Sequence, residues 1–253
     1  MEKPVVFKNN KGQQLVGTLH FSKKEKKSPA VIICHGFSGS KSQLKFVKLS
    51  RELSKKNVVS LRFDFSGHSD SEGEAENFTI KQGIKDLEAG FKFLSRLSFV
   101  DKRRIGLLGH SLAGVIVSLF ATNHPEIKTM VFWAPALNQK KLFKKWYTPD
   151  QIKKMQKQGY LDLEDFRIGI KYFDEAKNRD FTDETTKLKI PILIIHGIKD
   201  DVVPVNESRR LFKLLNYPKK LLIIKGGDHT LERYDIKQKV VKATVNWLLK
   251  YLK

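Results

Sequence analysis

Short apolar runs alternate along most of the chain with longer segments whose apolar residues recur every three or four positions. The runs predict buried strands and the longer segments predict helices. Strands are expected at residues 30–34, 58–63, 104–108, 129–133, 191–196 and 221–225. Helices are expected at residues 43–55, 79–97, 112–123, 206–215 and 236–252.

The predicted strands are almost continuously apolar, which is typical of a parallel sheet covered by helices on both faces. Two β-like runs open the chain at residues 5–8 and 14–21, with a turn at residues 9–12 between them. Their spacing predicts an antiparallel hairpin at one edge of the sheet. We therefore expect an α/β fold, a mostly parallel, doubly wound sheet with an N-terminal antiparallel hairpin.

Residues 138–188 interrupt this alternation, between two strands that a minimal fold would join by one helix. The segment is rich in lysine, aspartate and aromatic residues, and helices are expected at 151–158 and 163–173. A long insertion above the carboxyl ends of the strands predicts a lid, with a decorative surface insertion as the alternative. The expected domains are a core of residues 1–137 and 189–253 and a lid subdomain of residues 138–188.

The chain has 253 residues and a formal net charge of +21, carried mainly by lysines scattered through almost every segment. Clusters at 23–27 and 140–145 are accompanied by no nucleic-acid-binding motif. The charge therefore predicts a lysine-rich surface rather than a specific nucleic-acid site. Non-specific attraction to polyanions at low salt is still expected.

Cys34 is the single cysteine, so no internal disulfide can form and a cytoplasmic location is expected. The first residues contain no apolar signal region, and no stretch is long enough to span a bilayer. No His, Cys and carboxylate cluster has the spacing of metal ligands, so neither a metal nor an organic cofactor is expected.

The segment Gly109–Gly114 joins a predicted strand to a predicted helix and carries Ser111 at its centre. A serine on such a tight turn is the nucleophile elbow of hydrolases, and the residues two before and two after it must be small. Gly109 and Ala113 meet that demand. The alternative is a plain strand–turn–helix junction, since short matches of this kind also occur by chance.

Two later loops supply an acid and a base in the required order. Asp200 follows the strand at 191–196 and is the predicted orienting acid, with Asp201 as the rival. His229 follows the last strand, and of the seven histidines it alone comes after both nucleophile and acid. Asp228 is expected to stabilise the loop. The remaining histidines are expected to be structural or exposed, namely His20, His35, His68, His110, His124 and His196.

The loop His35-Gly36-Phe37 follows the strand at 30–34, where a donor to a developing oxyanion is expected. The backbone N–H groups of Phe37 and Leu112 form the predicted pair. His35 is a conceivable base, but anchoring of this loop by hydrogen bonds is the favoured interpretation.

These motifs, with Asp64–Ser69, resemble the α/β-hydrolase superfamily across nearly the whole chain. Within it the chain is most similar to small esterases that include bacterial cinnamoyl and feruloyl esterases, with monoacylglycerol lipases and acyl-peptidase-like proteins nearby. Two positions depart from the common pattern. Ala113 and Ser69 each stand where glycine is usual, and Ser69 puts the fine geometry of its loop in question.

The resemblance implies a serine esterase for small-molecule esters with short-chain or aromatic acyl groups. A thioesterase, a monoacylglycerol lipase or an acyl-peptidase with the same triad remains open, as does a non-catalytic binding protein. In the cinnamoyl-esterase relatives a comparable insertion covers the acyl pocket and supplies polar contacts. The candidates for such contacts here, each with ordinary lid packing as the alternative, are Trp146, Tyr147, Tyr160 and Tyr172.

Overall fold

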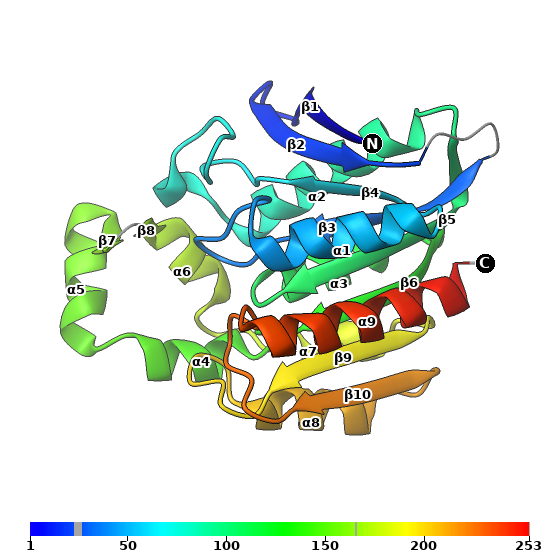
Figure 1. Ribbon diagram of the computed structural model, residues 1–253. Helices are drawn as coiled ribbons and strands as arrows, with labels where there is room; N and C mark the ends of the chain where they lie inside the picture. Colours follow the sequence, from blue (N-terminus) through cyan, green and yellow to red (C-terminus); the bar gives the residue numbers. More distant parts are fainter. Residues whose placement is uncertain (23–26, 165, 253) are drawn as a thin grey trace.

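A single eight-stranded sheet forms the centre of the computed structural model, which describes residues 1–22, 27–164 and 166–252 (Figure 1). The predicted lysine cluster at 23–27 lies outside the described residues except for Lys27. From one edge to the other the strands run β1 (Glu2–Lys8), β2 (Gln14–His20), β4 (Val59–Phe63), β3 (Ser28–Cys34), β5 (Val100–His110), β6 (Ile127–Trp133), β9 (Ile192–Gly197) and β10 (Lys219–Ile224).

Strands β1 and β2 pair antiparallel, β2 pairs antiparallel with β4, and every other pairing in this sheet is parallel. The predicted fold class and the N-terminal hairpin at the sheet edge are thereby confirmed. Because the other six strands run in one direction, the loops after β3, β5, β9 and β10 emerge at the same edge.

Helices cover both faces of the sheet (Figure 1). One layer contains α1 (Leu44–Lys55) and α9 (Tyr234–Tyr251), which pack against each other. The other contains α2 (Ile80–Ser95), α3 (Ala113–Ala121) and α8 (Val205–Leu214). Each predicted core helix and strand is present, with ends shifted by a few residues.

The apolar run of β3 explains why both faces are covered. Successive side chains of a strand point to opposite faces. Val31 and Ile33 therefore join the core beneath α1 and α9, whereas Ala30, Ile32 and Cys34 join the core beneath α2 and α3. All five side chains are buried. A strand that is buried on both faces needs this continuous apolar sequence.

Residues 138–188 form α4 (Gln139–Trp146), α5 (Pro149–Gln158), β7 (Tyr160–Leu163), β8 (Phe166–Gly169), α6 (Ile170–Ala176) and α7 (Thr182–Thr186). Figure 1 shows α4, α5, β7, β8 and α6 projecting beyond the carboxyl ends of the parallel strands. The predicted helix at 151–158 is confirmed, and α4 and α7 are additional.

The predicted helix at 163–173 is wrong in its first half, where β7 and β8 form a two-stranded hairpin instead. Leu161 and Ile168 pair across it and are buried, while their neighbours Asp162 and Arg167 are exposed, which is the alternation of a strand. Gly169 ends the hairpin against the backbone of a short 3-10 helix, η1 (Ala75–Asn77). A Cβ at position 169 would lie 1.8 Å from the Glu76 carbonyl oxygen, so only glycine allows this approach.

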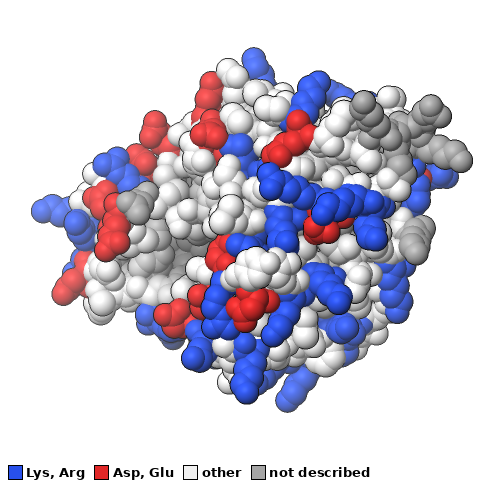
Figure 2. Space-filling view, in the orientation of Figure 1, with Lys and Arg blue, Asp and Glu red and all other residues white. Residues whose placement is uncertain are grey.

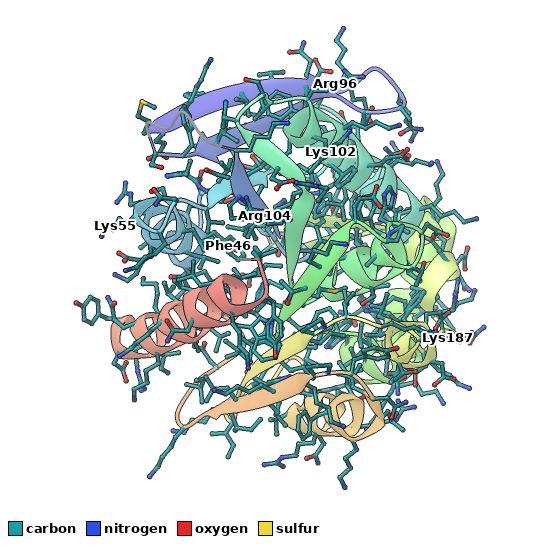
Figure 3. All side chains as sticks on the ribbon, turned by 90° about the vertical axis from the view of Figure 1, so that its right-hand side faces the viewer. Phe46, Lys55, Arg96, Lys102, Arg104 and Lys187 are labelled. Carbon is teal, nitrogen blue, oxygen red and sulfur yellow. The ribbon has the colours of Figure 1, made fainter. Side chains whose placement is uncertain are left out.

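The surface charge is dispersed, as expected from the sequence. Figure 2 shows lysine and arginine spread over the face made by α1 and α9, with acidic groups among them and towards the projecting segment. Figure 3 shows the side away from the projecting helices α4, α5 and α6, where the labelled basic residues come from several separate segments: Lys55, Arg96, Lys102, Arg104 and Lys187. Within the described residues, no helix is both long and apolar enough to cross a membrane.

Candidate active site

Ser111 lies on the turn between β5 and α3 and has a φ angle of 54°, in the left-handed region that non-glycine residues rarely adopt. Its amide donates to the Trp133 carbonyl at 2.9 Å, and its carbonyl accepts from Gly114 and Ala136. A Cβ on Gly109 would lie 2.6 Å from the Ala113 carbonyl oxygen, so glycine is required there. Ala113 itself is fully buried. The strained turn predicted from Gly109–Gly114 is present.

The loop after β3 packs directly against this turn. A Cβ on Gly36 would lie 3.0 Å from the Ser111 Cβ, so this loop approaches the turn that carries Ser111 closely. His35 anchors the loop, since its Nδ1–H donates to the Gly36 carbonyl at 2.7 Å and its Nε2 accepts from the Phe65 amide at 3.1 Å. Burial lowers the pKa of His35 to about 4, so the ring is neutral and both of its nitrogens are engaged. The anchoring interpretation of His35 agrees with this geometry.

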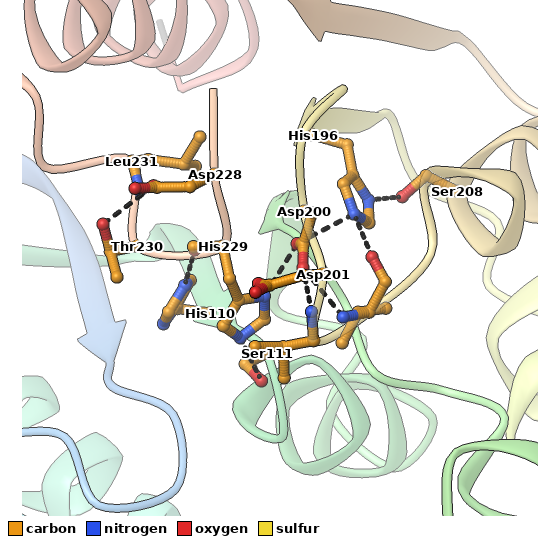
Figure 4. Close-up of polar contacts among 12 residues, drawn as sticks. His110, Ser111, His196, Asp200, Asp201, Ser208, Asp228, His229, Thr230 and Leu231 are labelled. Atoms are coloured by element: carbon orange, nitrogen blue, oxygen red, sulfur yellow. Dashed lines mark hydrogen bonds and ion pairs between the residues drawn. The ribbon is translucent and has the colours of Figure 1, made fainter. Parts of the chain in front are cut away.

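Ser111, His229 and Asp200 form a continuous chain of hydrogen bonds (Figure 4). The Ser111 hydroxyl lies 3.0 Å from His229 Nε2, and His229 Nδ1 lies 2.7 Å from Asp200 Oδ2. With Nδ1 donating to the carboxylate, Nε2 is left as the acceptor for the serine proton. The three residues come from the loops after β5, β9 and β10, as the sequence predicted.

Asp200 is held in place by both of its oxygens. Oδ1 accepts from the amides of Val202 and Val203 at 3.0 and 2.8 Å, and Oδ2 accepts from His229. Burial alone would raise the pKa of Asp200, but the hydrogen bonds from His196, His229 and Val203 outweigh it and lower that pKa well below its ordinary value. The carboxylate is therefore charged at any pH near neutrality. Asp201, the rival acid, is exposed.

His196 is the residue at this site that sequence reasoning underrated. It is fully buried, and its Nε2 lies 3.0 Å from Asp200 Oδ2 and 2.9 Å from the Val203 carbonyl. Its Nδ1 accepts from the Ser208 hydroxyl at 2.6 Å, which leaves the proton on Nε2, facing the carboxylate. The sequence signal that could have revealed His196 is its position at the end of β9, four residues before Asp200.

The loop that carries His229 is stabilised from within, as predicted for Asp228. The Asp228 carboxylate accepts from the Thr230 hydroxyl at 2.8 Å and from the Leu231 amide at 2.9 Å. Leu231 has a positive φ of 56° and is fully buried. These two hydrogen bonds tie the residues on either side of His229 to each other.

The four lid candidates lie in different surroundings. Tyr172 is buried, donates to Gln139 at 2.7 Å and stacks on Phe37 with ring centroids 5.1 Å apart. Trp146 donates to the Val202 carbonyl at 3.0 Å and so touches the Asp200 loop. Tyr147 packs against Phe173, and burial raises its pKa. Tyr160 lies beneath the Arg167 guanidinium.

In the part of the chain that the structure describes, no group of three or more His, Cys, Asp or Glu side chains could hold a metal ion. Cys34 is buried in β3, and burial raises the pKa of its thiol, so the thiolate needed for nucleophilic chemistry is disfavoured.

The model of the Prolyl oligopeptidase family matches residues 72–253. The palmitoyl-protein thioesterase ABHD10 of Mus musculus is 26% identical over 236 residues, which cover 86% of this chain and 75% of that protein. The structure of Est1E from Butyrivibrio proteoclasticus with ferulic acid bound is 26% identical, with a TM-score of 0.85, and covers 98% of this chain and 99% of that one. Mouse ABHD10, at 21% identity and a TM-score of 0.79, shares the fold.

Proposed function

Because the chain belongs to the prolyl oligopeptidase family of α/β hydrolases, we propose that it is a serine hydrolase that cleaves carboxylic esters of small molecules. The observation that carries the proposal is the hydrogen-bonded chain from Ser111 through His229 to Asp200. Each member lies after a different strand at one edge of the sheet. Such an arrangement makes a serine hydroxyl nucleophilic near neutral pH.

In the proposed reaction His229 Nε2 takes the Ser111 proton as Oγ attacks the ester carbonyl carbon. Asp200 keeps the His229 proton on Nδ1 and stabilises the imidazolium that forms. The tetrahedral intermediate collapses when His229 protonates the leaving alcohol, and the acyl group stays on Ser111. Water then attacks this acyl-enzyme, with His229 again acting first as base and then as acid. The carboxylic acid product is released, and the Ser111 hydroxyl is regenerated.

We assign the oxyanion site to the backbone N–H groups of Phe37 and Leu112. The contact of Gly36 with Ser111 supports the first donor, and the position of Leu112 directly after Ser111, at the amino end of α3, supports the second. A donor that faces the developing charge is worth on the order of 3 kcal/mol of barrier. The Phe37 ring also stacks on Tyr172, so the same residue joins the oxyanion site to the lid.

We further propose that residues 138–188 act as a lid that selects the acyl group. Tyr172, Phe166 and Phe37 bring aromatic rings together at the boundary between lid and body, which favours a flat or apolar acyl group. The likeness to Est1E with ferulic acid bound supports an aromatic acyl group. A thioester is the second candidate, because the matched thioesterase ABHD10 is equally similar in sequence.

The test compares wild type with Ser111→Ala on p-nitrophenyl acetate, p-nitrophenyl butyrate, methyl ferulate, a palmitoyl thioester and a peptide p-nitroanilide. Loss of the nucleophile should lower kcat on every accepted substrate by about 10³-fold or more. Ser118→Ala is the matched control, since Ser118 is buried in α3, the helix that follows Ser111, and donates to the Gly114 carbonyl. Wild-type turnover by Ser111→Ala would overturn the mechanism.

The order of rates across the panel then decides between the ester and thioester candidates. A preference for methyl ferulate supports the aromatic-ester proposal, and a preference for the palmitoyl thioester supports the second candidate. The cytoplasmic location expected from the single cysteine stays a prediction. The name of the matched thioesterase places that relative in mitochondria.

A further inference from the structure

Lys45 is a buried cation beside the loop that carries His229. It lies in the first turn of α1 with only 1% of its surface exposed, and its Nζ donates to the Thr230 carbonyl at 2.7 Å. Burial of an ammonium group is costly, so lysine is rarely found this deep without a specific partner. Its backbone amide also donates to the Glu232 carboxylate at 3.1 Å, which ties the start of α1 to the same loop.

His110 contacts the neighbouring carbonyl of this loop, and its Nε2 also lies 3.5 Å from Lys45 Nζ. The residue directly precedes Ser111, is 5% exposed, and its Nε2 lies 3.0 Å from the His229 carbonyl oxygen. A carbonyl can only accept, so the His110 ring must carry its proton on Nε2. Two buried donors from two different elements therefore meet two successive carbonyls, those of His229 and Thr230.

The protonation states of Lys45 and His110 agree with their roles as hydrogen-bond donors. Burial lowers the pKa of Lys45 to about 8, while Glu232 and Asp228 act to raise it and Lys237 to lower it, so the ammonium form prevails at neutral pH. Burial, together with the nearby Lys45 charge, holds the pKa of His110 well below its ordinary value. His110 is thus neutral and has a single N–H, which is used on the His229 carbonyl.

We propose that Lys45 and His110 are positioning residues that fix the backbone of His229 and Thr230 and thereby keep the His229 imidazole between Ser111 and Asp200. The inference rests on the proposed serine-hydrolase function. His229 Nε2 must stay within hydrogen-bond reach of the serine, and a displacement of about 1 Å at such a group can cost on the order of 100-fold in rate. The two donors restrain the backbone of this loop, whereas Asp200 restrains only the ring.

The first experiment replaces Lys45 by methionine, which has a similar length and no donor. We expect kcat on p-nitrophenyl acetate to fall about tenfold or more, KM to stay the same, and labelling of Ser111 by a fluorophosphonate to slow in parallel. Tm should fall modestly, because removal of the buried charge only partly offsets the hydrogen bond that the Thr230 carbonyl loses. Lys48→Met, one turn further along α1, is the matched control and should retain wild-type kcat.

The second experiment uses His110, so that the inference is tested even if Lys45→Met does not fold. His110→Leu removes the donor and should lower kcat, whereas His110→Gln places an amide N–H near the position of Nε2 and should recover much of that loss. Recovery by glutamine would not be expected if His110 only filled space. Unchanged kcat in both Lys45→Met and His110→Leu would overturn the positioning role.

Wild type and Ser111→Ala are measured in the same series to separate the two proposals. If wild type shows no turnover that depends on Ser111, the serine-hydrolase function itself fails. If that turnover is present but is insensitive to the loss of both donors, only the positioning inference fails.

Discussion

The sheet edge that carries Ser111, Asp200 and His229 and the lid above it are held by different kinds of contact. At the sheet edge, directional hydrogen bonds from buried groups fix each side chain, and the Asp200 carboxylate alone accepts four of them. In the lid, aromatic rings pack edge to face or stack on one another, as between Phe143 and Phe173, whose centroids are 5.3 Å apart. Directional bonds fix one geometry, whereas ring contacts tolerate exchange of one apolar group for another. We therefore expect changes at the edge to alter the rate of chemistry and changes in the lid to alter the choice of substrate.

The largest effect is expected from Asp200→Asn, which keeps the shape of the side chain but removes its charge. The amide would favour the wrong His229 tautomer, and kcat should fall by about 10⁴-fold on every ester alike. Asp201→Asn, at the exposed neighbour, is the control and should behave like wild type. A selective loss on some esters only would contradict the assignment of Asp200 to the chemical step.

The difference in stability between wild type and Asp200→Asn should also depend on pH. The pKa of Asp200 is lowered on folding, so its carboxylate stabilises the native state at every pH above the unfolded value of 3.8, and this contribution is lost as the pH falls through the lower native value. The difference in unfolding free energy between wild type and Asp200→Asn should thus be constant above about pH 5 and shrink in more acidic solution. Urea unfolding at a series of pH values measures it.

A smaller effect is expected at the second partner of Asp200. His196→Leu removes one donor to the carboxylate and leaves the Ser208 hydroxyl and the Val203 carbonyl without their histidine partner. We expect kcat to fall about tenfold with KM unchanged, and Tm to fall because buried polar groups lose hydrogen bonds. Ser208→Ala removes only the hydrogen bond from the Ser208 hydroxyl to His196 Nδ1. It should therefore lower kcat and Tm by less than His196→Leu does. Wild-type kcat in His196→Leu would mean that His229 and the backbone suffice to hold Asp200.

The smallest effect on chemistry is expected from the lid. Phe173→Ala removes one ring of the stacked pair and leaves a cavity that destabilises the lid locally by roughly 3–5 kcal/mol. Hydrolysis of p-nitrophenyl acetate should change less than threefold, while the ratio of kcat/KM between methyl ferulate and the acetate should change by about tenfold or more. Lys157→Ala, on α5, is the matched surface control. An equal loss on both esters would remove the distinction between edge and lid.

Much of the sheet and of its carboxyl edge could be predicted from sequence, because the signals are local. Continuous apolar runs mark the parallel strands, and the small residues around Ser111 mark the strained turn. The order of Ser111, Asp200 and His229 along the chain then fits one hydrolase arrangement.

The remaining features depend on contacts between distant segments. Nothing in the sequence near Lys45 shows that it is buried, because its partner Thr230 lies 185 positions away. The hairpin of β7 and β8 depends on the approach of Gly169 to Glu76. Helix α4 did leave a local signal that the lysine cluster obscured: Leu142, Phe143 and Trp146 share one face, and Asn138 caps its first turn.

Strand β10 lies at the end of the sheet order, with β9 as its neighbour, and the His229 loop follows it directly. An edge strand can open locally while the rest of a domain stays folded. Opening of β10 would carry the imidazole away from Ser111 and leave the nucleophile, its turn and the other strands in place. If β10 opens in this way, the fraction of molecules competent for reaction would follow a local equilibrium at one sheet edge, and amide hydrogen exchange along residues 219–224 would measure that equilibrium.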